Sequence, residues 1–122
     1  MKTQRPVNLN LFPQPLAAIV SISHRITGVM LFVGVAFGLY ALDMAMASPQ
    51  GFAEAKAMLS EPFPAFILLG LMFVLMFHLI AGIKHLLLDF HIGDTYAAAH
   101  TSAIVVVVLS LVVTGLLGAM IR

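Results

Sequence analysis

The chain contains the stretch FPAFILLGLMFVLMFHLIAGIKH at residues 63–85. It is long enough to cross a membrane as a helix, and until its last two residues it holds one ionisable side chain, His78. An ionisable group at membrane depth is costly and marks a candidate functional site. At about 100° per residue, His85 and Asp89 return to within about 20° of His78, with Gly82 between them. The pattern predicts one stripe on a spanning helix, where the small residue leaves room for a flat group such as haem.

The composition is that of a membrane protein. Of the 122 residues, 61% are apolar and 9% are charged, whereas a soluble domain carries about 25% charged residues. Three long apolar runs account for the excess, and each approaches the ~20 residues that a spanning helix needs. We therefore predict an all-α fold, a polytopic membrane protein with three transmembrane helices and a single membrane-anchor domain at residues 1–122. The predicted spans are residues 22–47, 63–88 and 101–121.

Composition also narrows the chemistry. The sequence has no cysteine, which excludes disulfides, thiolate metal sites and haem attached through cysteine. A net charge of +1 argues against nucleic acid as a partner, because such binding needs a basic patch. The segment 45–47 resembles a signal-peptide cleavage site, but the segment before it is too long and two prolines interrupt it. We expect a bacterial inner membrane as the location.

Prolines and polar residues mark the connections. Residues 1–15 hold three of the prolines and predict an extended lead-in on the membrane surface. Residues 48–51 predict a turn, and residues 52–60 predict a short interfacial helix. Two prolines open the second span, where the first helical turn tolerates them. A loop is predicted at residues 91–100.

The basic residues favour one orientation. Cytoplasmic loops carry the excess of Lys and Arg in membrane proteins. With the N-terminus inside, four basic residues fall on the cytoplasmic side and two outside; they are Lys2, Arg5, Arg25 and Lys84 against Lys56 and Arg122. We predict a cytoplasmic N-terminus.

A second constellation lies where the first span begins. Ser21 and Arg25 are four residues apart and share a helical face, with His24 beside them. A hydroxyl donor and a fixed cation suit an oxygen-bearing head group or a propionate. The alternative is that Arg25 extends to lipid phosphates, as basic residues at helix ends commonly do.

His78 is the leading ligand candidate. Neutral imidazole binds iron well, and haem iron is commonly held by an axial histidine. Only one histidine lies deep in a span, so a second axial ligand has to come from another chain. His85 and Asp89 are secondary candidates that relay protons or anchor propionates, unless they form only a solvated helix end. Two rival functions stay open: a haem-free structural subunit with an interhelical hydrogen bond from His78, and a proton-relaying subunit.

Three segments resemble the cytochrome b556 subunits of succinate dehydrogenase, the family of large membrane anchors of respiratory complex II. They are RPVNL at residues 5–9, SISHRITG at residues 21–28, and HLIAGIKH at residues 78–85 with Asp89 following. The resemblance covers nearly the whole chain, including its three spans and the order of the motifs. The second and third motifs together are specific to this family.

The resemblance implies a membrane anchor that carries haem b and works with a flavoprotein subunit, an iron–sulfur subunit and a second hydrophobic anchor subunit. It implies that His78 is an axial ligand of the haem iron and that the second anchor supplies the opposing histidine. Ser21 and Arg25 would line the ubiquinone site, and His24 would lie near the haem propionates. The implied activity is electron transfer from succinate to ubiquinone in the tricarboxylic acid cycle and aerobic respiration, in which this chain is not catalytic alone. Lys84 departs from the family, which usually has Arg there, and Lys lacks the planar fork of Arg.

Overall fold

The computed structural model describes residues 16–121. Within that range the chain is helical throughout apart from short connections, with the helices α1 (Leu16–Ala47), α2 (Pro49–Ser60), α3 (Pro62–Asp89) and α4 (Tyr96–Ile121). The predicted lead-in at residues 1–15 and the basic residues Lys2, Arg5 and Arg122 lie outside the described residues.

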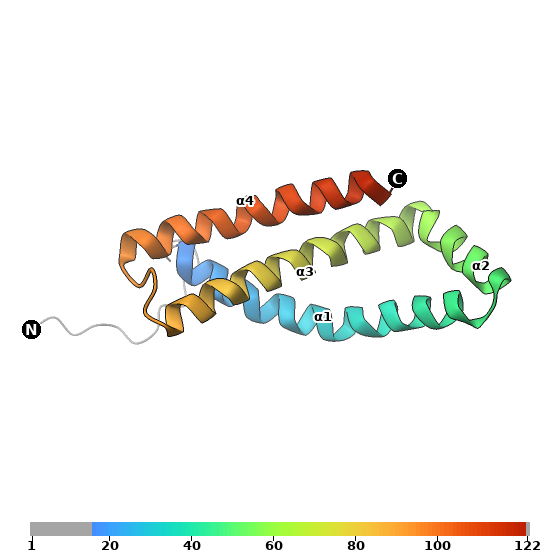
Figure 1. Ribbon diagram of the computed structural model, residues 1–122, viewed down its shortest axis with the longest axis horizontal. Coiled ribbons are helices and arrows are strands. Elements are labelled where there is room, and N and C mark those ends of the chain that lie inside the picture. Colours follow the sequence, from blue (N-terminus) through green and yellow to red (C-terminus); the bar gives the residue numbers. More distant parts are fainter. Residues whose placement is uncertain (1–15, 122) are drawn as a thin grey trace, which may run out of the picture.

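Three of the helices, α1, α3 and α4, are long and apolar enough to cross a membrane. They contain 32, 28 and 26 residues, which corresponds to about 39–48 Å of helix against a hydrocarbon core about 30 Å thick. The all-α prediction with three transmembrane helices is therefore confirmed. Figure 1 shows that the start of α1, the end of α3 and the start of α4 lie at one end of the molecule, and that α2 and the end of α4 lie at the other.

The turn between α1 and α2 is closed by a side-chain cap. Ser48 is the N-cap residue of α2, and its Oγ accepts a hydrogen bond of 2.9 Å from the backbone N–H of Gly51. Pro49 occupies the first helical turn, where its missing N–H costs nothing. A Cβ on Gly51 would collide with the carbonyl oxygen of Met44. The predicted turn at residues 48–51 is consequently the capped first turn of α2, which begins three residues before its predicted start.

The connections around α3 differ in how well they were predicted. Pro62 opens α3 as predicted. The loop after α3 includes His91 and Gly93, both with positive φ, but it is shorter than predicted because α4 begins at Tyr96. The predicted loop at residues 91–100 is wrong for its second half. The hydroxyl of Thr95 accepts a hydrogen bond of 3.1 Å from the N–H of Ala98, and the alanines that follow Tyr96 favour helix.

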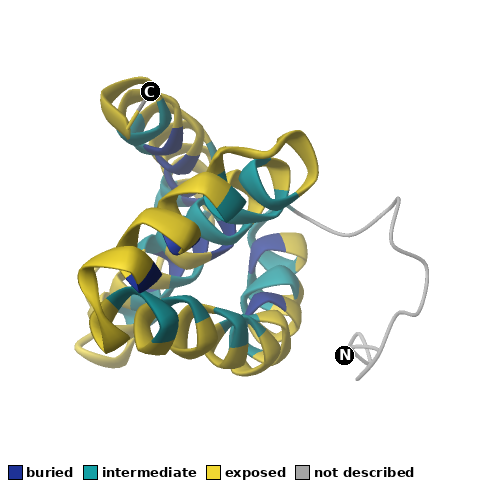
Figure 2. Ribbon diagram, turned by 90° about the vertical axis from the view of Figure 1, so that its right-hand side faces the viewer, coloured by how far each residue is buried: buried dark blue, intermediate teal, exposed yellow. Residues whose placement is uncertain are grey.

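The core lies where the three long helices meet near the end of the molecule that carries the start of α1. It is a cluster of small and aromatic side chains: Val20 from α1, Phe77 and Ala81 from α3, and Ala103 and Val106 from α4. The buried residues of α3 and α4 recur every three or four positions, which places each set on one helical face. Figure 2 shows the buried residues turned inward and the exposed residues on the outer faces. The outer faces are apolar, as a surface in contact with lipid or with another membrane helix requires.

Candidate functional site

His78 of α3 lies against the backbone of α1. Its Nδ1 is 3.1 Å from the carbonyl oxygen of His24 and 3.1 Å from Oγ1 of Thr27. A carbonyl oxygen can only accept, so Nδ1 carries the proton and donates it. The hydroxyl of Thr27 donates its own proton to the same carbonyl, at 2.9 Å, and therefore accepts from Nδ1. Within the described residues both hydrogen bonds of His78 use Nδ1, so the lone pair of Nε2 is left for another ligand.

Packing fixes the orientation of the His78 ring as well. The imidazole of His24 stacks on it, with ring centroids 4.0 Å apart and ring planes 10° apart. A Cβ on Gly28 would lie 3.1 Å from Cε1 of His78, so α1 and α3 approach closely at this point. The ring is held by hydrogen bonds at one nitrogen, by a stacked neighbour and by the backbone of α1.

Gly82 of α3 lies beside His24 of α1. A Cβ at this position would lie 3.4 Å from Nε2 of His24, whereas the glycine beside His78 is Gly28 of α1. That Gly82 leaves room for a flat group such as haem on this face of α3 stays a prediction. Two glycines on two helices each face one of the two stacked imidazoles.

The other ionisable candidates gather around His85. The ring of His85 meets that of His24 edge to face, with centroids 5.2 Å apart and planes 61° apart. Lys84 precedes His85 on α3, Asp89 follows it one helical turn later, and Arg25 adjoins His24 on α1. Arg25 and Asp89 are exposed, whereas Lys84 is only 7% exposed and shares the buried face of α3. The structure thus brings the predicted residues of the two motifs into one neighbourhood at one end of the bundle.

Two predicted features lie at the margin of this neighbourhood. Ser21 is partly exposed, one helical turn before Arg25 on α1. His91 and His100 are both exposed, and His91 lies 3.6 Å from the exposed carboxylate of Asp94. Neither of these two histidines joins the cluster around His78.

The sequence reasoning missed Thr27 and Gly28, which the structure places against His78. Thr27 is 8% exposed and belongs to the buried face of α1. A signal was available, because residues three and four positions after His24 share its helical face. What the sequence lacked was any indication that this face of α1 meets His78 of α3.

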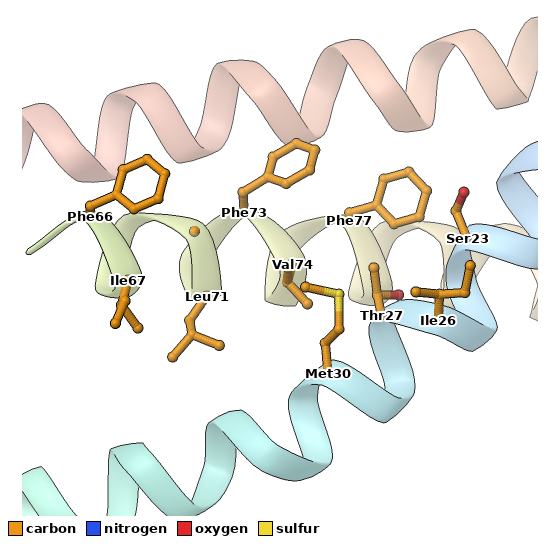
Figure 3. A pocket seen from close by; sticks show the side chains of 11 residues that line it. Ser23, Ile26, Thr27, Met30, Phe66, Ile67, Leu71, Phe73, Val74 and Phe77 are labelled. Atoms are coloured by element: carbon orange, nitrogen blue, oxygen red, sulfur yellow. The ribbon is translucent and has the colours of Figure 1, made fainter. Parts of the chain in front are cut away.

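An apolar groove of about 660 Å³ between α1 and α3 reaches the site from the membrane interior. Figure 3 shows Ser23, Thr27 and Met30 of α1 opposite Val74 and Phe77 of α3. Thr27 therefore stands between this groove and His78. A second groove of about 690 Å³ lies among α1, α2 and α3 in the other half of the molecule.

The donor set suits iron in a macrocycle better than a bare metal ion. Among residues 16–121, no three His, Asp or Glu side chains are arranged to hold a metal ion. Haem iron needs only axial protein ligands, because the macrocycle supplies the other donors. One imidazole with a protonated Nδ1 and a free Nε2 meets that need.

The chain matches known proteins over nearly its full length. A model of the family "Succinate dehydrogenase/Fumarate reductase transmembrane subunit" matches residues 1–117. The succinate dehydrogenase cytochrome b556 subunit of Coxiella burnetii is 37% identical over 123 aligned residues, which cover 97% of each chain. The subunit of the same name from Paracoccus denitrificans is 37% identical over 118 residues, covering 89% of this chain and 91% of the relative.

Proposed function

Since the chain belongs to the succinate dehydrogenase/fumarate reductase transmembrane subunit family, we propose that it is the anchor that holds haem b and builds part of the ubiquinone site of a succinate:ubiquinone oxidoreductase. Its share of the reaction is electron transfer in the tricarboxylic acid cycle and aerobic respiration. It is not catalytic alone. The relatives carry the name cytochrome b556, which supports haem b as the cofactor.

The observation that carries the proposal is the state of the His78 imidazole. Metal-binding histidines usually donate one ring N–H to a carbonyl or similar acceptor, which fixes the tautomer and leaves the other nitrogen for the metal. Nδ1 of His78 donates to the carbonyl of His24 and to Thr27. The close approach of Gly28 and the stacked ring of His24 limit rotation of the imidazole. These features support His78 Nε2 as an axial ligand of haem iron.

Among the described residues, His78 is the one that would hold the haem iron. His24 is stacked on His78 and its carbonyl accepts from that ring, and the family resemblance assigns its imidazole to the haem propionates. A second hydrophobic anchor subunit would supply the other histidine that holds haem b. Held between the two subunits, haem b would supply a one-electron carrier within the membrane. His85 and Asp89 are secondary residues near the propionates.

The ubiquinone site is proposed at the same end of the bundle. Ser21 is partly exposed and Arg25 is exposed, one turn apart on α1. The Ser21 hydroxyl would donate a hydrogen bond to a quinone carbonyl, and the Arg25 guanidinium would stabilise the negative charge that develops on it. Hydrogen bonds to charged groups are worth about 1.5–3 kcal/mol, so Arg25 is the larger contributor. Lys84 is buried on the α3 face and receives no role in this site.

The same end of the bundle would face the electron-donating subunits. We propose a cytoplasmic N-terminus in a bacterial inner membrane, because Arg25 and Lys84 lie near the end of the bundle that carries the start of α1. A flavoprotein subunit and an iron–sulfur subunit would dock there. Electrons from succinate would then reach ubiquinone without crossing the full membrane thickness.

The second candidate is a haem-free structural subunit. His78 already makes an interhelical hydrogen bond to the His24 carbonyl, which a merely structural histidine would also make. A redox difference spectrum of the complex, purified through a tag on this chain, separates the two functions. We expect a dithionite-reducible low-spin b-type haem, together with co-purifying flavoprotein, iron–sulfur and small anchor chains.

A second preparation, without the small anchor chain, tests whether another subunit supplies the second haem ligand. Expressed without the small anchor, this chain should not hold haem in a low-spin state, because one axial imidazole would be missing. A complex with all four chains and no reducible haem would overturn the haem assignment. A low-spin haem in this chain alone would overturn the sharing of ligands between two anchors.

A further inference from the structure

We propose that Thr27 is the positioning residue of His78, and that its hydroxyl tunes the midpoint potential of the haem through the Nδ1–H hydrogen bond. The inference rests on the proposed function, in which His78 is an axial ligand. It concerns a residue that does not touch the iron and acts only through His78.

The geometry defines the direction of two protons, that of the Thr27 hydroxyl and that on Nδ1 of His78. The Thr27 hydroxyl lies 2.9 Å from the His24 carbonyl oxygen and 3.1 Å from Nδ1 of His78, and that nitrogen lies 3.1 Å from the same carbonyl. The Thr27 hydroxyl has one proton, which it donates in a hydrogen bond to the His24 carbonyl. Its lone pair is therefore turned to the Nδ1–H, and the ring proton is shared between two oxygen acceptors.

Burial makes this arrangement persistent. Thr27 is 8% exposed, and threonine in a helix commonly bonds the carbonyl three or four residues earlier. Here that carbonyl belongs to His24, which stands beside His78. The helix of α1 thus fixes the hydroxyl at the position where α3 delivers the imidazole.

The consequence for a ligated haem follows from the charge on the imidazole. An oxygen that accepts a hydrogen bond from Nδ1–H raises the basicity of Nε2, the nitrogen that would bind iron. A more basic ligand favours the ferric state. Loss of one of the two acceptors should therefore favour the ferrous state and raise the midpoint potential. A net hydrogen bond of ordinary strength corresponds to about fivefold in an equilibrium constant. Because the bond is present in both redox states, that factor, about 40 mV for a one-electron couple at 59 mV per tenfold, is the upper bound on the shift.

Three substitutions separate the hydroxyl from its packing. Thr27→Val keeps the branched shape and removes the hydroxyl, whereas Thr27→Ser keeps the hydroxyl and removes the methyl group. Thr114→Val in α4 is the matched control, because Thr114 is 6% exposed and its Oγ1 has no hydrogen-bond partner among the described residues. Each variant is purified as the complete complex, and its haem is titrated potentiometrically with the low-spin signal recorded at each end point.

We expect the midpoint potential to rise by up to about 40 mV in Thr27→Val, and to stay near the wild-type value in Thr27→Ser and Thr114→Val. If the Thr27→Val complex holds no haem while the Thr27→Ser complex does, the result also supports the inference, because the hydroxyl is then required to position His78. An unchanged potential in Thr27→Val, or an equal shift or haem loss in Thr27→Ser, would overturn the inference. A wild-type complex without low-spin haem would instead refute the proposed function itself.

Discussion

The substitution Gly28→Ala tests the packing around His78. The added Cβ would lie 3.1 Å from Cε1 of His78, where carbon atoms prefer about 3.5–4.0 Å. The imidazole cannot retreat freely, because Nδ1 is bonded to α1 and His24 is stacked on the ring. The substitution should therefore displace the ring or separate the two helices.

The magnitude follows from two opposing effects. Overpacking a filled site costs about 1–3 kcal/mol, while alanine stabilises a helix interior by about 0.5–1 kcal/mol relative to glycine. The net effect of Gly28→Ala is a loss of about 0–2.5 kcal/mol. Gly38→Ala on the same helix is the control, because a Cβ at that position meets nothing within 4 Å. That variant should gain the helix term alone.

The assay is thermal loss of haem absorbance from each purified complex, with the low-spin spectrum recorded before heating. We expect Gly28→Ala to lose haem at a lower temperature than the wild-type protein and to show an altered low-spin spectrum. We expect Gly38→Ala to match or exceed the wild-type temperature. If the two variants behave alike, the close approach of α1 to His78 does not support the ligand and the reasoning is refuted.

The remaining predictions concern the quinone site and the topology. Ser21→Ala should slow ubiquinone reduction while succinate oxidation with a soluble dye acceptor stays near normal. Arg25→Leu should slow it more severely, since a hydrogen bond to a charged group is worth about 1.5–3 kcal/mol. Normal ubiquinone turnover in both variants would support the alternative that Arg25 only contacts lipid phosphates. A reporter fused after residue 122 should be active only in a form that functions outside the cytoplasm, because three spans put the two ends of the chain on opposite sides of the membrane. Cytoplasmic activity of that fusion would reverse the proposed orientation.

The helices were predictable because membrane insertion leaves few alternatives. A run of about 20 apolar residues must form a helix in lipid, since no water is present to satisfy its backbone groups. The three spans, and Pro62 at the start of α3, follow directly from that rule. The start of α4 was less predictable, because the cap at Thr95 is a local signal that resembles an ordinary polar loop.

The contacts of the site were only partly predictable. Periodicity places His78, Gly82 and His85 on one face of a helix, but it does not say which neighbouring helix meets that face or at what height. The pairing of Gly28 with His78, and of Gly82 with His24, depends on how α1 is rotated and shifted against α3. That arrangement is a tertiary property, so Thr27 was visible in the sequence without an indication of its partner.

The central claim is that Nε2 of His78 binds the haem iron, and one measurement tests it most directly. The complex is purified with His78→Leu, and its redox difference spectrum is compared with those of His91→Leu and His100→Leu, whose histidines are both exposed. Co-purifying chains are quantified in each preparation, so that loss of haem is distinguished from loss of assembly. We predict that the low-spin b-type spectrum is abolished or strongly altered in His78→Leu and unchanged in the other two. An unchanged spectrum in an assembled His78→Leu complex would contradict the account.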